Sequence, residues 1–357
     1  MVKAAVFVGP NGSGKTNTLK AIKFLLDALF SENQVPSIEG INSCLFSPDQ
    51  SLSLKYVFLI DKQEIKYSLS AGKEGEILKE ELFLDDNVML RRDQTTATTS
   101  LTDQKEFSKK ELSPSLLLLR TIFFNTKFVR FPTLQKWFAF LSNSIYFNAA
   151  KASITAYSGV GMPFMKNYLE NNDGVSKIND FLKSGKFGSH IDFASKEKVS
   201  KYVNLEVLGS DGDSQRKTVF FHRNDIDISL PLSLESQGNQ TFVRFLPALL
   251  QVAEKPGMLL CDEFSSGLHP ELETFLIDGF LNLAKGSQLF ITSHSTSLLH
   301  SSLLRPDQIF ITSISKEGTD IERMSSFHPR DSQNFEKMYL SGLFGGVPSY
   351  KSFLQKK

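Results

Sequence analysis

The chain has 357 residues, with 40 Lys and Arg against 39 Asp and Glu, so its formal net charge is +1. A balance this close to neutral gives no overall electrostatic reason to expect binding to nucleic acid or to a membrane surface. Apolar residues make up 41% and charged residues 22%, as in ordinary globular proteins, which excludes wholesale disorder. No apolar run approaches the roughly 20 residues of a membrane-spanning helix, so we expect a cytoplasmic protein without membrane contact.

The strongest signal near the N-terminus is a glycine-rich loop at residues 9–16. It reads Gly-Pro-Asn-Gly-Ser-Gly-Lys-Thr and fits the pattern G-x-x-x-x-G-K-[ST] in full. An apolar run rich in strand formers precedes it at residues 3–8, and apolar residues at helical spacing follow it between Leu19 and Leu29. This pattern binds phosphate when a strand precedes the glycine loop and a helix follows it. A chance glycine turn would need neither the strand nor the helix.

Each residue type in this loop has a physical role. Glycines let backbone N–H groups approach phosphate oxygens without a Cβ in the way, and the following helix directs its positive N-terminal end at the same oxygens. Lys15 adds a positive charge for the β and γ oxygens of ATP, and the Thr16 hydroxyl is a predicted ligand of Mg²⁺. The predicted nucleotide contacts are Gly9, Pro10, Asn11, Gly12, Ser13, Gly14, Lys15 and Thr16.

The middle of the chain changes character several times. Alternating residues at 52–60 and 65–69 predict two antiparallel strands joined by a tight turn. The polar segment 85–113 predicts an exposed loop, and the aromatic-rich segment from Leu116 to about Leu182 has helical periodicity. Two strand-like runs at 203–207 and 217–222, on either side of Gly209–Gly212, predict a hairpin.

The C-terminal half alternates helix and strand signals. Residues 240–253 have a helical pattern, 258–261 form a short buried apolar run, 270–284 are again helical, and 287–292 form a second apolar run. This alternation predicts a mostly parallel sheet, so we expect an α/β fold.

Two carboxylates, Asp262 and Glu263, come directly after the first of these apolar strands. In an open α/β sheet, ligands bind beyond the carboxyl ends of the strands, where the glycine loop is also expected. We predict that Asp262 holds Mg²⁺ and that Glu263 orients and deprotonates an attacking water. The alternative is a solvated acidic strand end without a catalytic role.

One histidine has a comparable position. His294 follows the next predicted strand and stands among hydroxyl residues, which favours a contact with the γ-phosphate. The other five lack such a setting: His222, His269 and His300 have weaker claims, and His190 and His328 are expected to be structural. The two cysteines, Cys44 and Cys261, have no metal-ligand spacing.

Taken in order, these motifs resemble those of ABC-type ATPases, the class that includes SMC and RecF proteins. Leu234–Gln240 then stands where that class has its signature loop, and it reads Ser-Gln-Gly instead of Ser-Gly-Gly. The resemblance implies that Ser236 and Gly238 contact the γ-phosphate of ATP held by the opposite subunit. It also implies a mostly parallel phosphate-loop sheet with an antiparallel β subdomain and a helical lobe. The expected parts are a first ATPase-core segment at 1–95, an inserted loop and helical lobe at 96–202, and a second core segment at 203–357.

The sequence resembles more closely the AAA-labelled ATPases of the OLD and abortive-infection group, found in bacterial phage-defence operons. The matching stretches are Phe221–Arg223, Leu234–Gln240, Asp262–Pro270, Leu304–Gln308 and Tyr339–Pro348. Besides the Ser-Gln-Gly signature, two features depart from that group: Met1 lies almost at the phosphate-loop strand, which suggests a shortened N-terminus or a misassigned start, and the Gln-loop has only the weak candidates Gln50 and Gln63.

The resemblance implies an ATP-hydrolysing switch that forms a homodimer or higher homo-oligomer around ATP. It also implies a partner, a separately encoded TOPRIM-type nuclease used against phage. An alternative is a RecF- or SMC-like ATPase that binds or scans DNA, and a third is a scaffold that holds ATP without hydrolysing it. The DNA alternative needs a basic surface. The available clusters are short and mixed with acids, so we expect solvated faces; they are Arg91–Arg92, Lys109–Lys110 and Lys196, Lys198 and Lys201.

Overall fold

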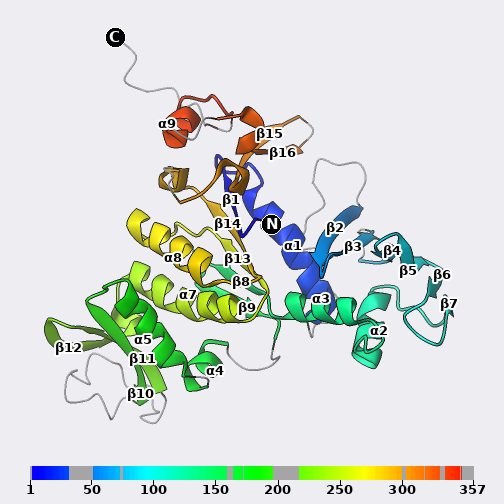
Figure 1. Ribbon diagram of the computed structural model, residues 1–357, viewed down its shortest axis with the longest axis horizontal. Helices are drawn as coiled ribbons and strands as arrows, with labels where there is room; N and C mark the ends of the chain where they lie inside the picture. Colours follow the sequence, from blue (N-terminus) through cyan, green and yellow to red (C-terminus); the bar gives the residue numbers. More distant parts are fainter. Residues whose placement is uncertain are drawn as a thin grey trace. The chain divides into compact units, whose positions relative to one another are not determined.

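The computed structural model divides the chain into two compact units (Figure 1). The first comprises Met1–Lys15, Ile145–Thr155 and Gly161–Lys357, and the second comprises Thr16–Ser144 and Ala156–Val160. The structure describes residues 2–31, 51–72, 75–158, 164–171, 173–195, 217–299, 303–316, 318–329, 334–345 and 347.

The first unit is built on a seven-stranded sheet with the order β16-β15-β1-β14-β13-β8-β9. β1 pairs in parallel with β14 and β15, and β13 pairs in parallel with β14 and β8, whereas β16 is antiparallel to β15. This topology confirms the predicted mostly parallel α/β sheet. The strands are β1 (Ala4–Val8), β8 (Ile145–Asn148), β9 (Ser153–Ala156), β13 (Met258–Asp262), β14 (Gln288–Ser293), β15 (Ile309–Ser315) and β16 (Gly318–Arg323).

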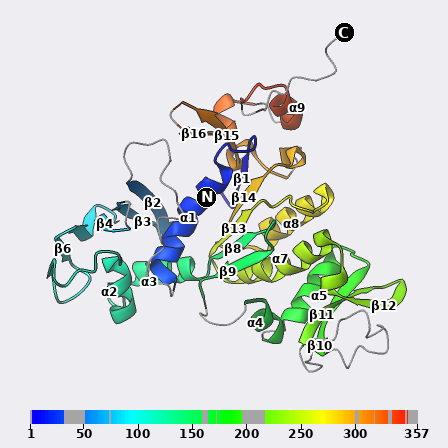
Figure 2. The same ribbon diagram turned by 180° about the vertical axis from the view of Figure 1, so that it is seen from behind.

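The central strands are buried, as strands of a parallel sheet usually are, and β8 and β13 are apolar up to a polar last residue, Asn148 and Asp262. All residues of β1, β8 and β13 are buried. Figures 1 and 2 show helices α7 (Gln237–Glu254) and α8 (Pro270–Leu283) side by side along this sheet. Phe245 of α7 contacts Phe147 of β8 and Phe264, with ring centroids 5.2 and 5.4 Å apart. This packing fixes the ends of β8 and β13, where the predicted carboxylates lie.

A small antiparallel sheet, β10-β11-β12, completes the first unit together with short helices. β11 is its middle strand and pairs with both neighbours. The elements are β10 (Ser189–Ser195), β11 (Lys217–Arg223), β12 (Ile226–Pro231), α4 (Phe164–Glu170), α5 (Gly174–Ser184), α9 (Phe335–Leu340), and the 3₁₀ turns η3 (Leu232–Leu234), η4 (Thr296–Leu299), η5 (Pro306–Gln308) and η6 (Met324–Phe327).

The second unit contains a six-stranded antiparallel sheet in sequential order, β2 to β7, and helices packed around aromatic side chains. Trp137 and Phe138 are fully buried. Trp137 contacts Phe58 and Tyr67, with ring centroids 5.5 and 6.1 Å away. The elements are β2 (Leu52–Ile60), β3 (Gln63–Ala71), β4 (Ile77–Leu84), β5 (Asn87–Asp93), β6 (Thr96–Thr99), β7 (Glu106–Ser108), α2 (Leu118–Thr126), α3 (Pro132–Ser142) and α1 (Lys15–Phe30), whose first residue belongs to the first unit.

The sequence predictions for the middle of the chain are partly wrong. The strands at 52–60 and 65–69 are confirmed as β2 and β3, but the predicted loop 85–113 contains β5, β6 and β7. The inward residues of these strands include Arg92, Ala97 and Thr99, so no apolar alternation marks them.

The predicted helical segment 116–182 contains four helices, but it also contains β8 and β9 of the central sheet. β11 pairs with β10 and β12, while the predicted partner run 203–207 and its turn lie outside the described residues. The division at 95/96 and 202/203 remains a prediction. In the described ranges, no helix combines the length and apolarity needed to cross a bilayer.

Candidate functional site

The glycine loop connects β1 to the first residue of α1, as its sequence predicted. Lys15 is only 5% exposed, and its ammonium group donates to the carbonyl oxygens of Gly9 and Pro10, both at 2.8 Å. Burial lowers the pKa of Lys15, whereas the nearby charges of Asp262 and Glu263 raise it. The lysine is therefore held at its own loop, within electrostatic reach of both predicted carboxylates.

The shape of the loop depends on glycine at position 14. Gly14 has a φ of +92°, a left-handed conformation that side chains disfavour. A Cβ there would also lie 2.1 Å from Oγ1 of Thr319 in β16, closer than atoms can approach. On the inner side of the loop, the hydroxyls of Ser13 and Thr312 share a buried hydrogen bond of 2.6 Å. Asn11 and Gly12 are exposed, so the tip of the loop is open to a ligand.

Asp262 ends β13 and is 1% exposed. One carboxylate oxygen accepts a hydrogen bond of 2.6 Å from the hydroxyl of Thr292 in β14. The other accepts from Tyr146 and Asn148 of β8, at 3.2 and 3.3 Å. Donors on both neighbouring strands thus hold a buried carboxylate in place, as a buried charge requires. Carboxylate oxygens are ligands that Mg²⁺ prefers, so Asp262 fits the predicted metal role.

Glu263 follows at a sharp turn of the backbone. Its φ is +55°, an uncommon value for a residue other than glycine. Its N–H donates to the Thr292 hydroxyl at 2.9 Å, so this one hydroxyl serves both acidic residues. The turn ends the strand and leaves the Glu263 side chain half-buried beside Asp262. Backbone strain of this kind is often found at active sites.

His294 directly follows β14, the strand that lies between β1 and β13 in the sheet. Partial burial and the charge of Lys15 lower the pKa of His294, and Glu263 and Asp262 raise it. The histidine therefore shares one electrostatic environment with the lysine and both carboxylates. Since β1, β14 and β13 are parallel neighbours, their carboxyl ends bring these four predicted residues to the same edge of the sheet.

The predicted signature residues begin helix α7. The Ser236 side chain is exposed and caps the helix, accepting a hydrogen bond of 3.3 Å from the N–H of Asn239. A Cβ on Gly238 would lie 2.4 Å from the carbonyl oxygen of Gly267, which belongs to the loop after Glu263. The start of α7 and this loop are thus in close backbone contact. The contact of Ser236 and Gly238 with ATP of a second subunit remains a prediction.

Sequence reasoning missed the residues that support the site. Thr292, Tyr146 and Asn148 all bind Asp262, yet none belongs to the phosphate-loop pattern. For Thr292 a signal existed, because a polar residue at the end of a buried strand needs a hydrogen-bond partner. For β8 no signal existed, since the strand itself was not predicted.

Several other predicted residues have a different position or no described one. Thr16 belongs to the second unit, and its role as a Mg²⁺ ligand remains a prediction. Gln63 donates a hydrogen bond of 3.1 Å to Asp85 within the second unit, and its assignment to a Gln-loop gains no support. Outside the described residues lie Cys44, Gln50, Lys196, Lys198, Lys201 and His300.

The Arg91–Arg92 pair is not a free basic cluster. Arg92 is 2% exposed and donates to the carbonyl oxygens of Leu116 and Ser113, at 2.7 and 2.5 Å. Arg91 is paired with Glu81 at 2.9 Å. Only Arg91 of the pair is exposed, and it is shared with Glu81, so this pair does not offer two free guanidinium groups to a phosphate backbone.

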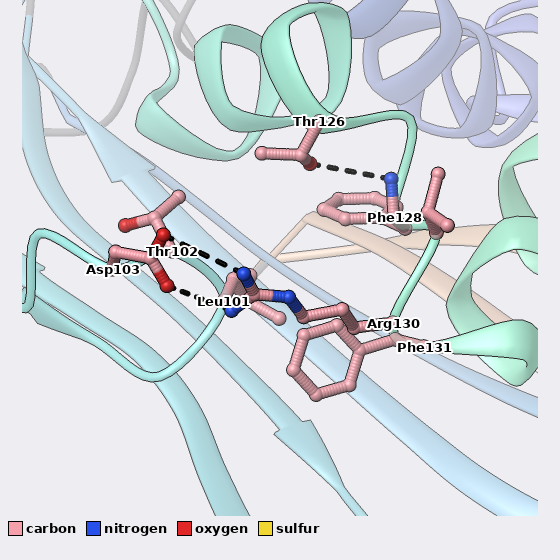
Figure 3. A pocket seen from close by; sticks show the side chains of 8 residues that line it. Leu101, Thr102, Asp103, Thr126, Phe128, Arg130 and Phe131 are labelled. Carbon is pink, nitrogen blue, oxygen red and sulfur yellow. Dashed lines mark hydrogen bonds and ion pairs between the residues drawn. The ribbon is translucent and has the colours of Figure 1, made fainter.

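A separate cavity of about 360 Å³ lies in the second unit (Figure 3). The α2–α3 connection lines it with Phe128, Arg130 and Phe131, and Asp103 faces them from the loop before β7. Arg130 and Asp103 form an ion pair of 2.7 Å at its rim. The cavity contains none of the residues predicted to bind nucleotide.

Comparison with known proteins gives one family match. The family described as "AAA domain, putative AbiEii toxin, Type IV TA system" matches residues 4–300. No curated protein sequence matches the chain significantly.

Among solved structures, similar ones are SMC head domains. That of Thermotoga maritima has 17% identity, a TM-score of 0.45 and coverage of 89% of each chain. An SMC head bound to the C-winged helix domain of ScpA has 15% identity, a TM-score of 0.49, and coverage of 90% of this chain and 89% of that one.

Proposed function

Because the chain belongs to this AAA-domain family of P-loop ATPases, we propose that it binds and hydrolyses ATP and acts as a dimerising switch. The main support is the arrangement at the sheet edge: Lys15 after β1, His294 after β14, Asp262 at the end of β13 and Glu263 directly after it. Membership also fits the closer resemblance predicted from the motifs, to ATPases of the abortive-infection group.

The residues at the sheet edge divide the work of phosphoryl transfer. Lys15 would leave its carbonyl contacts, or share them, to bind the β and γ oxygens of ATP, and His294 would donate to the γ-phosphate. Glu263 would orient the attacking water and accept its proton as the bond to ADP breaks, giving ADP and phosphate. Asp262 and Thr16 would hold Mg²⁺, which neutralises the charge that develops on the phosphate oxygens.

Ser236 and Gly238 would complete the site of a second copy of the chain. Ser236 is exposed at a helix N-terminus, where the helix dipole and free backbone N–H groups favour an anion. Two copies would then enclose two ATP molecules, and hydrolysis would remove the γ-phosphate that joins them. ATP would set the fraction of closed dimer through its higher affinity for that state.

The partner of the switch would be an effector encoded separately, and we infer a TOPRIM-type nuclease used in defence against phage. The family description, which names a toxin of a toxin–antitoxin system, supports a role in conflict or defence. Co-purification of the neighbouring gene product with and without ATP tests the partner directly.

Mixing two inactive variants tests the shared site. Lys15→Ala removes the phosphate contact, and Ser236→Arg blocks the contact made in the partner's site. A dimer of one copy of each variant would contain one site with an intact Lys15 and an intact Ser236. We therefore expect ATPase activity and ATP-dependent heterodimers only when the two variants are mixed. If the mixture has no more activity and forms no more dimer than the separate variants, the site is not shared between subunits.

A further inference from the structure

Two histidines and an aspartate meet on the small antiparallel sheet of the first unit, outside the proposed ATP site. Figures 1 and 2 show the strands of this sheet, β10, β11 and β12. His190 of β10 is directly opposite His222 of β11 in the register of the two strands. Asp192 follows two residues after His190, so it projects from the same face of β10. The sequence predicted a structural role for His190, because it stands in no motif.

The three side chains are close enough to share one ion. The imidazole rings of His190 and His222 are stacked, with centroids 4.6 Å apart and planes at 4°. A carboxylate oxygen of Asp192 lies 3.1 Å from Nε2 of His222. One ligand atom of each residue lies within 4.8 Å of the other two. Ligand atoms of a tetrahedral zinc ion with bonds of 2.0–2.2 Å are about 3.3–3.6 Å apart, so small rotations of these side chains would close the site.

The far side of each imidazole ring is already occupied. The Nδ1 of His222 is hydrogen-bonded to the hydroxyl of Ser229 at 2.6 Å, and the Nδ1 of His190 lies 3.4 Å from the side-chain oxygen of Asn224. Such outer partners fix the tautomer and orientation of metal-bound histidines. In this arrangement Nε2 of each ring is the nitrogen left to bind an ion.

Nε2 of His222 is also buried without a hydrogen-bond partner, although the Asp192 oxygen is near. A buried nitrogen in that position is expected to have some partner. An ion between the ring and the carboxylate would supply it.

Burial lowers the pKa of His222, and so does the neighbouring His190, while Asp192 raises it. A lowered pKa favours the neutral ring at pH 7, and only the neutral ring can bind a metal ion. The pKa shift agrees with the geometry without being needed for it.

We propose that His190, Asp192 and His222 form a binding site for a divalent transition-metal ion, of which Zn²⁺ fits best. Two imidazoles and one carboxylate suit zinc better than Mg²⁺ or Ca²⁺, which prefer all-oxygen sites. Three protein ligands leave the fourth position to water or to another ligand. The ion joins β10 to β11, so its binding stabilises this sheet. The site is independent of the ATPase proposal and shares no residue with it.

Zinc titration of the metal-free full-length protein, followed by isothermal calorimetry and thermal unfolding, tests the site. The wild type is expected to bind one Zn²⁺ and to unfold at a higher temperature when zinc is present. Asp262→Asn is a second control, because it removes the carboxylate predicted to hold Mg²⁺ at the ATP site and should still bind this zinc ion.

His190→Ala and Asp192→Asn change exposed side chains and are expected to lose or strongly weaken the zinc signal without unfolding the chain. His222→Ala has the same expected effect. Ser229→Ala leaves the ligands in place and is expected to weaken binding about 10–100-fold, as loss of an outer partner does. His328→Asn is the matched control, since it removes a histidine elsewhere and Asn tolerates the left-handed backbone at that position, φ 50°.

Two results would overturn the proposal. One is a wild-type protein that binds no zinc, which would mean that the cluster is held by the His–His stack and the His222–Asp192 ion pair alone. The other is unchanged zinc affinity in His190→Ala and Asp192→Asn, which would place the bound ion elsewhere.

Discussion

Both units bury an acid and a base, but they use them differently. In the second unit, the Glu80 carboxylate accepts from the N–H groups of Leu118 and Leu119, at 2.8 and 3.0 Å, and from Tyr67 at 3.0 Å. It caps helix α2 and lies 3.9 Å from the guanidinium of Arg92. Glu80 and Arg92 thus connect the antiparallel sheet to the start of helix α2, and each lies beside the opposite charge.

In the first unit, the charges lie near each other and are held by neutral groups. Lys15 donates to two carbonyl oxygens, and Asp262 accepts from hydroxyl and amide groups. Neutral groups hydrogen-bond the buried acid and base in both units, so partner type alone does not distinguish them. The difference is that Glu80 also has Arg92 as a counter-charge at 3.9 Å, whereas the hydrogen bonds described for Lys15 and Asp262 are to neutral groups. We therefore expect a structural role for the pair in the second unit and ligand binding for the charges in the first.

We expect the largest effect from Glu263→Gln in the first unit, which should lower the ATPase rate and leave stability unchanged. Glu263→Gln keeps the shape of the side chain but cannot take a proton from water, so the ATPase rate is expected to fall by about 10²–10⁴-fold. The unfolding temperature should not change. Glu271→Gln, which neutralises an exposed glutamate nearby, is the control. Undiminished turnover in Glu263→Gln would remove this residue from catalysis, and no turnover in the wild type would favour the ATP-holding scaffold.

In the second unit, neutralising the buried acid Glu80 is expected to lower stability. Glu80→Gln leaves Arg92 buried without its counter-charge and removes an acceptor from the start of α2. It is expected to lower the free energy of unfolding by about 3–5 kcal/mol, measured by urea denaturation. The adjacent Glu81→Gln breaks only a partly exposed ion pair and should cost about 1 kcal/mol or less. Equal losses in the two variants would contradict the structural role of Glu80.

Lys15→Ala tests whether the buried base of the first unit, unlike Arg92 in the second, serves ATP binding and not stability. The lysine is expected to bind phosphate through charge-assisted hydrogen bonds, and their loss should weaken ATP binding about 10–100-fold. Stability should change little, because the contacts that hold Lys15 are with its own loop. Lys20→Ala, one turn further along the same helix, is the control in equilibrium binding. Equal ATP affinity in all three proteins would exclude the glycine loop as the phosphate site.

A smaller effect is expected from Gly238→Ala, where the new Cβ would meet the Gly267 carbonyl oxygen at 2.4 Å. Overpacking of this kind costs about 1–3 kcal/mol, and it should also disturb ATP-dependent dimerisation. Gly188→Ala is the matched control, because nothing lies within 4 Å of its added Cβ. If thermal unfolding shows both variants to be as stable as the wild type, the loop contact at Gly238 is not tight in solution.

The smallest effect concerns pH. Since the pKa of His294 is lowered in the folded protein, the unfolded chain takes up its proton first as the pH falls through about 6.5. Stability is therefore expected to decrease as the pH drops below that value, and His294→Asn should show less of this decrease. If the wild type and His294→Asn have identical pH profiles of unfolding, the ring of His294 is not partly buried near Lys15 as described.

The sequence was sufficient to place the predicted site residues at the strand ends, but not to predict the residues that hold them there. The glycine loop, Asp262, Glu263 and His294 follow short apolar strands, so a local pattern places each of them. Thr292, Asn148 and Tyr146 reach Asp262 from 30, 114 and 116 residues away in the chain, and no local pattern predicts such contacts.

The fold shows the same limit. The alternation in β2 and β3 is clear, whereas β5 and β6 direct Arg92, Ala97 and Thr99 inward. Their polar side chains are satisfied by hydrogen bonds that only the folded chain provides, such as that from Thr99 to the Met89 carbonyl at 2.8 Å. β8 has a continuous apolar sequence, which periodicity alone does not separate from a buried helix.

Sedimentation of Glu263→Gln with ATP and with ADP tests the central claim, that ATP held by Lys15, Asp262 and Glu263 joins two copies of the chain. The account predicts a dimer with ATP, a monomer with ADP, and a monomer with either nucleotide when Lys15→Ala is added. A protein that stays monomeric in saturating ATP, or that dimerises equally in both nucleotides, would contradict it.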